Sequence, residues 1–174
     1  MSSFPAQNEL SITAERPDER DSMLLLARLR EELAQKYPDE LRGVSPAPDD
    51  FMKAGAIFVV ARQNGKALGC GAIRPLEPGV AEVKRMFVAP EARGRGIGRA
   101  VLEKLETLAR ELGYCAIRLE TGLKQPEAIA LYEAAGFKPY PCYGPYATNP
   151  LSVCFEKQLR ATVSSFEFPV PGSG

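Results

Sequence analysis

The stretch that decides the fold runs from residue 83 to residue 99 and reads VKRMFVAPEARGRGIGR. Its apolar first part predicts a strand that ends near Val88, and the glycines after it predict a loop that opens a helix. Glycines let backbone N–H groups approach a ligand closely, and a helix N-terminus presents unpaired donors and a positive potential. Positive charge is added at the same place by Arg93, Arg95 and Arg99. This combination is suited to a pyrophosphate group.

Two other phosphate-binding motifs do not match this stretch. A Walker loop requires Gly-Lys-Ser/Thr at its end, but Gly98 is followed by Arg99 and Ala100. A dinucleotide fingerprint requires GxGxxG, and here the third glycine would fall on Arg99 or on Val101. Taken alone, the stretch is also compatible with a glycine-rich turn whose arginines are solvated.

Hydrophobic patterns on both sides of this stretch predict one domain of mixed α and β structure. Apolar, partly β-branched runs around Asn64-Gly65 indicate a β-hairpin. Strands are expected at residues 9–14, 56–62, 67–73, 80–88, 115–119, 141–146 and 151–156. Helices are expected at residues 17–36, 101–112 and 126–135, with a short one at 49–53. Because three consecutive strands follow the first helices, the pattern argues against strict βαβ winding and favours an α/β or α+β fold.

Composition narrows the possible functions. Lys plus Arg and Asp plus Glu each total 22, so there is no net field to hold nucleic acid or an anionic membrane. The N-terminal residues lack the pattern of a signal peptide, and no segment has the apolar length to cross a bilayer. The sequence has no histidine, which removes Ser-His-Asp and Cys-His machinery and His-ligated metal sites. We therefore expect a cytoplasmic protein without a metal, nucleic acid or membrane partner.

The four cysteines are expected to be free thiols. Cys70, Cys115, Cys142 and Cys154 are widely spaced and form no CxxC pair. Together with the missing export signal, this spacing indicates a reducing compartment. The cysteines are then interpreted as small apolar side chains inside strands.

Two motifs resemble the signatures of the GNAT superfamily of N-acetyltransferases. Residues 93–98, RGRGIG, are similar to the R/Q-x-x-G-x-G/A motif that holds the pyrophosphate of acetyl-CoA, and residues 126–137, PEAIALYEAAGF, resemble a helix carrying A-x-x-L-Y-x-x-x-G-F. The resemblance implies a GNAT-like twisted mixed sheet of about six to seven strands flanked by helices. One domain would span residues 1–160, with a mobile tail at 161–174. It also implies direct transfer of the acetyl group of acetyl-CoA to a primary amine of a small molecule or amino acid, and a homodimer.

The resemblance assigns the cofactor-binding residues. Backbone groups of Met86, Phe87 and Val88 would meet the pantetheine arm and the thioester, and the N–H of Phe87 or Val88 would stabilise the oxyanion. Gln125 stands where many relatives have asparagine. The pyrophosphate would lie against Arg93, Gly94, Arg95, Gly96, Ile97, Gly98 and Arg99.

Tyr132 and Glu82 are the candidate catalytic residues. Tyr132 stands where the family often has a tyrosine near the departing sulfur, and a phenol keeps its proton at neutral pH; the alternative is a packed core aromatic. Glu82 resembles the strand glutamate that histone-type relatives use as base; the alternative is a rim carboxylate paired with Lys84 or Arg85. Unless a bulge intervenes, ideal alternation places on one face Glu82, Lys84, Met86 and Val88.

The acceptor pocket is expected to be lined by Tyr37, Arg74, Tyr143 and Tyr146. The last two belong to an aromatic-Pro-Gly stretch at 140–146, which is also compatible with an ordinary rigid loop. Direct transfer is expected because no cysteine has a histidine partner. Two other functions stay open: a protein N-terminal or lysine acetyltransferase with an extended peptide groove, and a non-catalytic acyl-CoA sensor.

Overall fold

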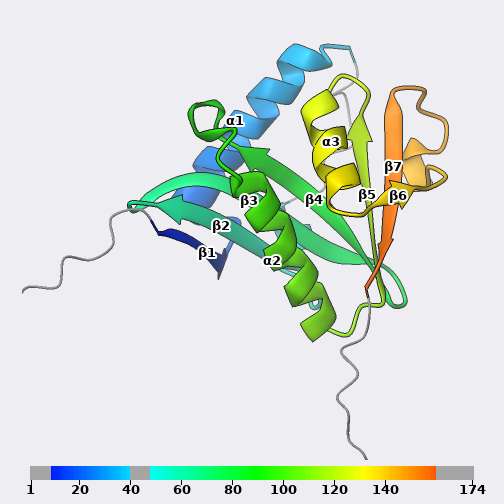
Figure 1. Cartoon of the computed structure of the whole chain (residues 1–174), viewed down its shortest axis with the longest axis horizontal. Coiled ribbons are helices and arrows are strands. Elements are labelled where there is room, and N and C mark those ends of the chain that lie inside the picture. The colour runs from blue at the N-terminus through cyan, green and yellow to red at the C-terminus, as the bar shows by residue number, and fades with distance from the viewer. Residues whose placement is uncertain (1–8, 40–47, 160–174) are drawn as a thin grey trace, which may run out of the picture.

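The structure is a computed structural model that describes residues 9–39 and 48–159 (Figure 1). Its strands are β1 (Leu10–Glu15), β2 (Ile57–Gln63), β3 (Lys66–Glu77), β4 (Val80–Val88), β5 (Ala116–Gly122), β6 (Lys138–Pro139) and β7 (Ser152–Gln158). Its helices are α1 (Arg20–Lys36), α2 (Ile97–Glu111) and α3 (Pro126–Ala134), with 3-10 turns η1 (Pro48–Phe51), η2 (Pro90–Ala92) and η3 (Gly144–Tyr146). The tail predicted at 161–174 lies outside the described residues.

The seven strands form one mixed sheet in the order β1-β2-β3-β4-β5-β7-β6, as the predicted fold class requires. All neighbouring pairs are antiparallel except β4 and β5, which are parallel. The predicted hairpin is confirmed: β2 and β3 are joined at Asn64-Gly65, and both residues have positive φ, 53° and 75°. Two positive φ values match the turn that Asn-Gly favours between twisted strands.

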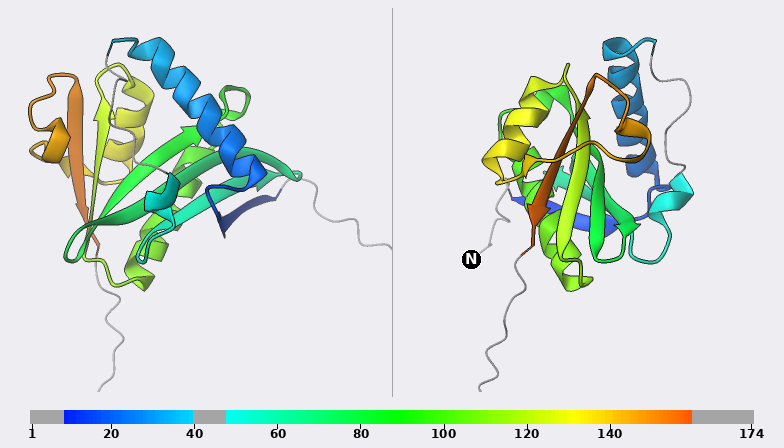
Figure 2. Two further views of the ribbon diagram at one scale, coloured as in Figure 1. Left: turned by 180° about the vertical axis from the view of Figure 1, so that it is seen from behind. Right: turned by 90° about the vertical axis from the view of Figure 1, so that its right-hand side faces the viewer.

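The sheet opens between its two central strands. β4 pairs with β5 only from Val80 to Val83, opposite Ala116 to Leu119. Beyond that point β4 stays with β3 as far as Val88, whereas β5 stays with β7 as far as Gly122. The two halves of the sheet therefore diverge into a V (Figures 1 and 2). The V exposes strand backbone that a ligand can use.

The helices cover both faces of the sheet. α1 lies on one face, and α2 and α3 lie on the other (Figure 2). The helix predicted at 101–112 is confirmed as part of α2, and it buries one apolar face that includes Val101 and Leu105, whereas Leu112 at its end is exposed. Gly71 on β3 allows this helix to approach, because an added Cβ would come within 2.9 Å of the Val101 and Leu105 side chains.

The strand predicted at 141–146 is wrong. The chain forms only the two-residue β6 and then turns through η3. Pro141 and Pro145 have no N–H for a strand ladder, and Gly144 adopts a φ of 52°. The same segment is tied to β7 by a disulfide, Cys142–Cys154.

The prediction of four free thiols is therefore wrong for one pair. Cys142 and Cys154 are 12 residues apart, but β6 pairs with β7 and brings their Cα atoms to 5.2 Å, a distance that a disulfide spans. Cys70 and Cys115 are free. Cys70 is buried in β3 as expected, whereas Cys115 precedes β5 and is exposed.

Candidate active site

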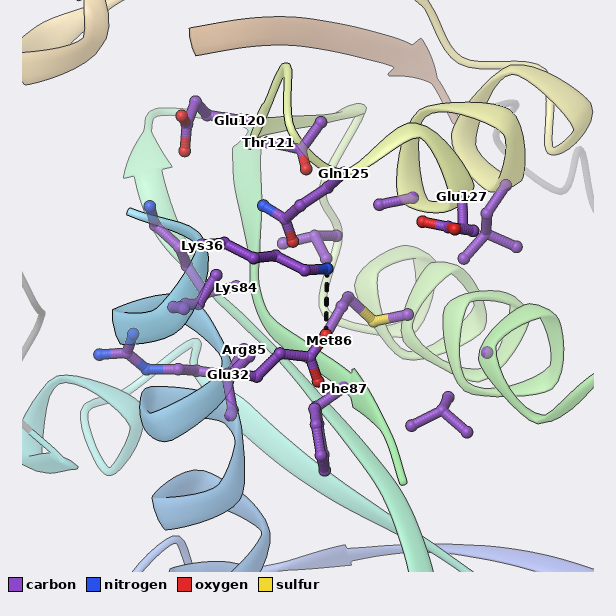
Figure 3. A pocket seen from close by; sticks show the side chains of 18 of the residues that line it. Glu32, Lys36, Lys84, Arg85, Met86, Phe87, Glu120, Thr121, Gln125 and Glu127 are labelled. Atoms are coloured by element: carbon purple, nitrogen blue, oxygen red, sulfur yellow. Dashed lines mark hydrogen bonds and ion pairs between the residues drawn. The ribbon is translucent and has the colours of Figure 1, made fainter. Parts of the chain in front are cut away.

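One cavity of about 1180 Å³ fills the opening between β4 and β5. Its walls come from α1, the second half of β4, the glycine-rich loop, the end of β5, α3 and η3. Figure 3 shows this arrangement, with Met86 and Phe87 at the centre and Gln125 facing them from the start of α3. Segments that are far apart in the sequence therefore line the same cavity.

The glycine-rich loop forms one end of the cavity. Gly94, Gly96 and Gly98 line it, and the first two have φ of 78° and 79°. An added Cβ at Gly94 or Gly96 would meet nothing within 4 Å, so open space lies before the loop. Ile97 and Arg99, in the first turn of α2, also line the cavity. Backbone N–H groups at this helix start are available to an anion.

The arginines of this loop already form hydrogen bonds and ion pairs within the protein, which the sequence does not indicate. Arg93 lines the cavity but donates to the carbonyl of Val88 at 2.9 Å and pairs with Glu32 at 2.5 Å. Arg99 also lines the cavity and pairs with Glu103 at 2.8 Å. The remaining arginine of the predicted set, Arg95, is absent from the cavity wall and donates to the carbonyl of Glu91 at 3.0 Å. Attraction for an anion at this end thus depends mainly on backbone N–H groups.

A bulge at Arg85 overturns the ideal alternation of β4. The register slips between the pairs Ala72–Lys84 and Cys70–Phe87, and Arg85 adopts a φ of 61°. Met86 therefore packs beside Gly71 under α2, whereas Lys84 lies against η3. Bulges shift every later side chain to the other face. Three predicted residues, Met86, Phe87 and Val88, line the cavity.

Glu82 is fully buried and is not a rim carboxylate. One of its oxygens accepts from Arg74 Nε at 3.0 Å, and the other accepts from the Tyr143 hydroxyl at 2.6 Å. Lys84 Nζ lies 3.7 Å away. Burial and then the hydrogen bond to Glu82 raise the pKa of Tyr143. Neither Glu82 nor the two predicted acceptor residues bonded to it, Arg74 and Tyr143, line the cavity.

Lys84 and Tyr146 connect this buried group to the cavity. Both line it, and Lys84 Nζ donates to the Tyr146 hydroxyl and lies 4.5 Å from the centre of its ring. Desolvation lowers the pKa of Lys84, although the charge of Glu82 acts against this. Burial raises the pKa of Tyr146 to about 12.

Tyr132 and Tyr37 also line the cavity. Tyr132 is 5% exposed and packs against Phe137, with ring centroids 5.9 Å apart, so it both reaches the cavity and belongs to the core. Burial, and secondarily the charge of Glu120, raise its pKa. The hydroxyl of Tyr37 accepts from the backbone N–H of Lys124 at 3.1 Å and so joins α1 to the β5–α3 loop.

Comparison with known proteins identifies the family. The model of the acetyltransferase (GNAT) family matches residues 25–137. The chain belongs to the GNAT acetyltransferase family. A relative named IAA acetyltransferase, from Azospirillum brasilense, is 42% identical over 151 residues, which cover 86% of this chain and 98% of that protein.

Solved structures carry the same GNAT fold. A Klebsiella pneumoniae protein described as an acyl-CoA N-acyltransferase superposes with a TM-score of 0.72 at 35% identity, covering 87% of this chain and 98% of the other. The PaiA N-acetyltransferase of Thermoplasma acidophilum, solved in complex with coenzyme A, has a TM-score of 0.62 at 17% identity and covers 85% and 99%. At that identity the second likeness shows the fold alone.

GNAT enzymes use acetyl-CoA. Two features of this chain match two parts of that cofactor. The open space before Gly94 and Gly96 admits a pyrophosphate to the start of α2. The β4–β5 ladder covers only Val80–Val83 of the described chain, which leaves the β5 side of the later β4 backbone for an amide-bearing arm. In residues 9–39 and 48–159, no three His, Cys, Asp or Glu side chains are grouped to hold a metal ion. Among the same residues, no helix is long and apolar enough to cross a membrane.

Several charged residues of the GNAT cavity could not be recognised from the sequence pattern. Lys84 appeared only as a partner of Glu82, although its place two residues further along the strand put it on the same face. Glu120 lies just past the last β4–β5 pair, where the two strands separate. The strand pattern in the sequence does not indicate where this separation begins. Arg30 lines the cavity from an exposed helix position and carries no signal in the sequence.

Proposed function

We propose that this enzyme transfers the acetyl group of acetyl-CoA directly to a primary amine of a small molecule or amino acid. The observation that carries the proposal is that one continuous cavity has a glycine-rich helix start at one end and Lys84 and Tyr146 at the other. A cofactor entering from the first end would present its thioester at the β4 bulge, where an amine from the second end would meet it. The relative named IAA acetyltransferase, whose name denotes a small molecule, supports a small molecule as the acceptor.

Backbone groups would make most of the contacts with the cofactor. N–H groups of the loop from Gly94 to Arg99 would hold the pyrophosphate, and Gln125, which lines the cavity, would contact the arm. The N–H of Phe87 or Val88 would stabilise the negative charge that develops on the thioester oxygen as the amine attacks. Such fixed donors need no rearrangement during the reaction.

Tyr132 would protonate the departing sulfur. Its raised pKa keeps the phenol protonated at neutral pH, so it is able to donate as the C–S bond breaks. The cysteines support direct transfer, because Cys142 is held in a disulfide and the exposed Cys115 does not line the cavity. The acetyl group would then pass straight to the amine nitrogen, which forms the new C–N bond.

Glu82 would act on the amine through its neighbours. Because it is sealed behind the cavity wall, it is a positioning group for Lys84 and Tyr146, which reach the amine side. Lys84 would pass one of its protons to the Glu82 carboxylate, 3.7 Å away, and take the ammonium proton in its place, so that Glu82 is the final acceptor of the proton. The cytoplasmic location and the homodimer stay predictions.

A thiol-release assay tests the proposal. Purified protein and acetyl-CoA are mixed with a panel of amines, amino acids and peptides, and free coenzyme A is measured together with the acetylated product. We expect turnover with small amines in preference to peptides. Preference for peptides would make this a protein acetyltransferase. Acetyl-CoA binding by calorimetry without any transfer would make it an acyl-CoA sensor.

A further inference from the structure

The cavity is bordered by elements from both faces of the sheet, and the face that carries α1 is the acceptor side. α2, whose start would hold the pyrophosphate, lies with α3 on the other face (Figure 2). Tyr146, which would meet the amine together with Lys84, belongs to η3, and η3 lies on the same face as α1 (Figure 2). The side chains that α1 contributes to the cavity therefore face the rest of the acceptor.

α1 spans the V and is attached to both of its sides. On the β4 side, Glu32 of α1 pairs with Arg93 of the glycine-rich loop at 2.5 Å. On the β5 side, the hydroxyl of Tyr37, which follows α1 directly, accepts from the N–H of Lys124 at 3.1 Å. Tyr37 fits there because Gly122 has no side chain, since an added Cβ would come within 1.8 Å of its hydroxyl oxygen. The helix is thus held at a fixed place over the opening of the sheet.

This helix presents three leucines to the cavity. Leu26, Leu29 and Leu33 recur at helical spacing, and all of them line it. Leu26 and Leu33 are only half-buried, so apolar surface is left for a ligand to cover. Phe51 of η1 also lines the cavity and belongs with Leu29 to one buried apolar cluster. Arg30 lines the same side but is exposed to solvent. The α1 side of the cavity therefore has an apolar wall, formed by Leu26, Leu29, Leu33 and Phe51.

The charged groups beside the apolar wall are engaged within the protein. Lys84 lies 3.7 Å from the buried Glu82. Glu120 accepts a hydrogen bond from a serine hydroxyl of β7 at 2.8 Å. The guanidinium of Arg85 lies 5.5 Å from the centre of the Phe51 ring. What the acceptor side offers a substituent of the amine is therefore mainly apolar contact.

We propose that the acetyl acceptor is a hydrophobic primary amine, whose alkyl or arylalkyl chain packs against the apolar wall while the amine faces the β4 bulge. Small-molecule pockets commonly join an apolar lining to a few polar groups that orient the ligand, and Lys84 and Tyr146 would orient the amine here. Each methylene that the wall buries should improve binding about fourfold, which corresponds to about 0.8 kcal/mol. The inference rests on the proposed acetyltransferase function and narrows its acceptor class.

A homologous series of amines tests the apolar wall on the unaltered protein. Ethylamine, butylamine and hexylamine have ammonium groups of nearly equal pKa, so their intrinsic reactivities are alike. We expect kcat/KM for butylamine to exceed that for ethylamine by at least about tenfold, because two more methylenes are buried. The amino alcohol in which a hydroxyl replaces the terminal methyl of butylamine should be several-fold poorer than butylamine, because its hydroxyl loses hydration against an apolar wall.

Two variants locate the effect on α1. Leu26→Ala and Leu33→Ala shorten the half-buried leucines, and each should reduce the hexylamine-to-ethylamine ratio of kcat/KM by at least about threefold. The acetyl-CoA dissociation constant, measured by calorimetry, should change little in both. Leu24→Ala is the matched control, because this leucine of α1 is 56% exposed and does not line the cavity. The control should keep both the ratio and the dissociation constant.

The outcomes separate the apolar wall from the reaction itself. Equal kcat/KM for the three amines, a preference for the amino alcohol, or unchanged ratios in both Leu26→Ala and Leu33→Ala would overturn the inference and leave the acetyltransferase intact. Weaker acetyl-CoA binding in these variants with an unchanged ratio would overturn it too, by assigning the leucines to the cofactor. Acetylation of no amine at all would overturn the proposed function together with the inference. A series that rises with chain length, and less steeply in either variant than in the Leu24→Ala control, supports the hydrophobic acceptor.

Discussion

The two ends of the cavity are built in different ways. The cofactor end comes from one continuous stretch, residues 83–99, and offers mainly backbone N–H groups. The acceptor end is assembled from α1, β4, β5 and η3, and offers side chains: Arg30, Arg85, Lys84 and Tyr146. A backbone site keeps its chemistry when side chains vary, whereas a side-chain site changes with each substitution. The difference suggests how one fold can keep a common acetyl donor while its acceptors differ.

The largest effect is expected when the cofactor end is blocked. Gly96→Glu places a negative side chain in the open space before the loop, and like charges about 4 Å apart repel by roughly 4 kcal/mol near a protein surface. Acetyl-CoA affinity measured by calorimetry should fall by at least about a hundredfold. Gly79→Glu is a matched control, because Gly79 has a φ of 77°, equally open surroundings and no place in the cavity. Equal losses in both variants would mean that backbone strain, and not the site, is responsible.

A smaller effect is expected from the buried carboxylate behind the acceptor end. Glu82→Gln should lower kcat/KM about a hundredfold at neutral pH, the lower range of acid–base catalysis. The loss should shrink as pH rises, because more of the free amine is already neutral. Glu106→Gln is the control, since this glutamate is also buried and ion-paired, with Lys157 at 2.8 Å. An unaltered pH–rate profile for Glu82→Gln would remove Glu82 from the proton route.

Tyr132 should affect the rate of the chemical step and not the binding of acetyl-CoA. Tyr132→Phe keeps the ring and removes the hydroxyl, so kcat should fall by at least about tenfold while acetyl-CoA affinity changes little. Tyr140→Phe, a tyrosine that does not line the cavity, is the control. A near-normal kcat for Tyr132→Phe would leave Tyr132 as a packing residue and return the proton donor to solvent.

Loss of the disulfide should weaken binding at the acceptor end of the cavity by a few-fold and leave binding at the cofactor end unchanged. The Cys142–Cys154 bond ties the segment that carries Tyr143 and Tyr146 to β7. Cys142→Ala should raise the KM for the amine several-fold and leave the acetyl-CoA dissociation constant unchanged. Cys115→Ala, which removes a free exposed thiol, should change neither. Equal weakening of both substrates by Cys142→Ala would show that the bond stabilises the fold without favouring one end.

The smallest effect is expected outside the cavity. Glu15 on β1 pairs with Arg62 on β2, and the hydrogen bond from Arg62 is the main cause that lowers the pKa of Glu15. A carboxyl with a lowered folded-state pKa stabilises the fold above its unfolded pKa and loses this contribution as pH falls through the folded value. Glu15→Gln should therefore reduce the free energy of unfolding by about 1 kcal/mol or less at pH 7, and by less at pH 3. Denaturation at the two pH values measures this, and a loss that grows toward pH 3 would contradict the assignment.

Much of the fold was predictable because local patterns and tertiary structure agree. The Asn64-Gly65 hairpin, the helix α2 and its glycine-rich start appear where the sequence placed them. The strand predicted at 141–146 failed because its prolines cannot join a ladder. The alternation predicted for β4 failed at Arg85, where a bulge turned Met86 to the other face.

The sequence by itself determined the family resemblance and the cofactor loop, because both depend on residues close together in the chain. Backbone conformation at glycines and helix starts is a local property, so a motif such as RGRGIG is readable without a structure. Only the tertiary structure decided that Cys142 meets Cys154, that Glu82 is sealed off, and that Arg30 faces the same space as Arg85. These are juxtapositions of side chains from separate elements, set by strand register and helix packing, and no local pattern in the chain encodes them.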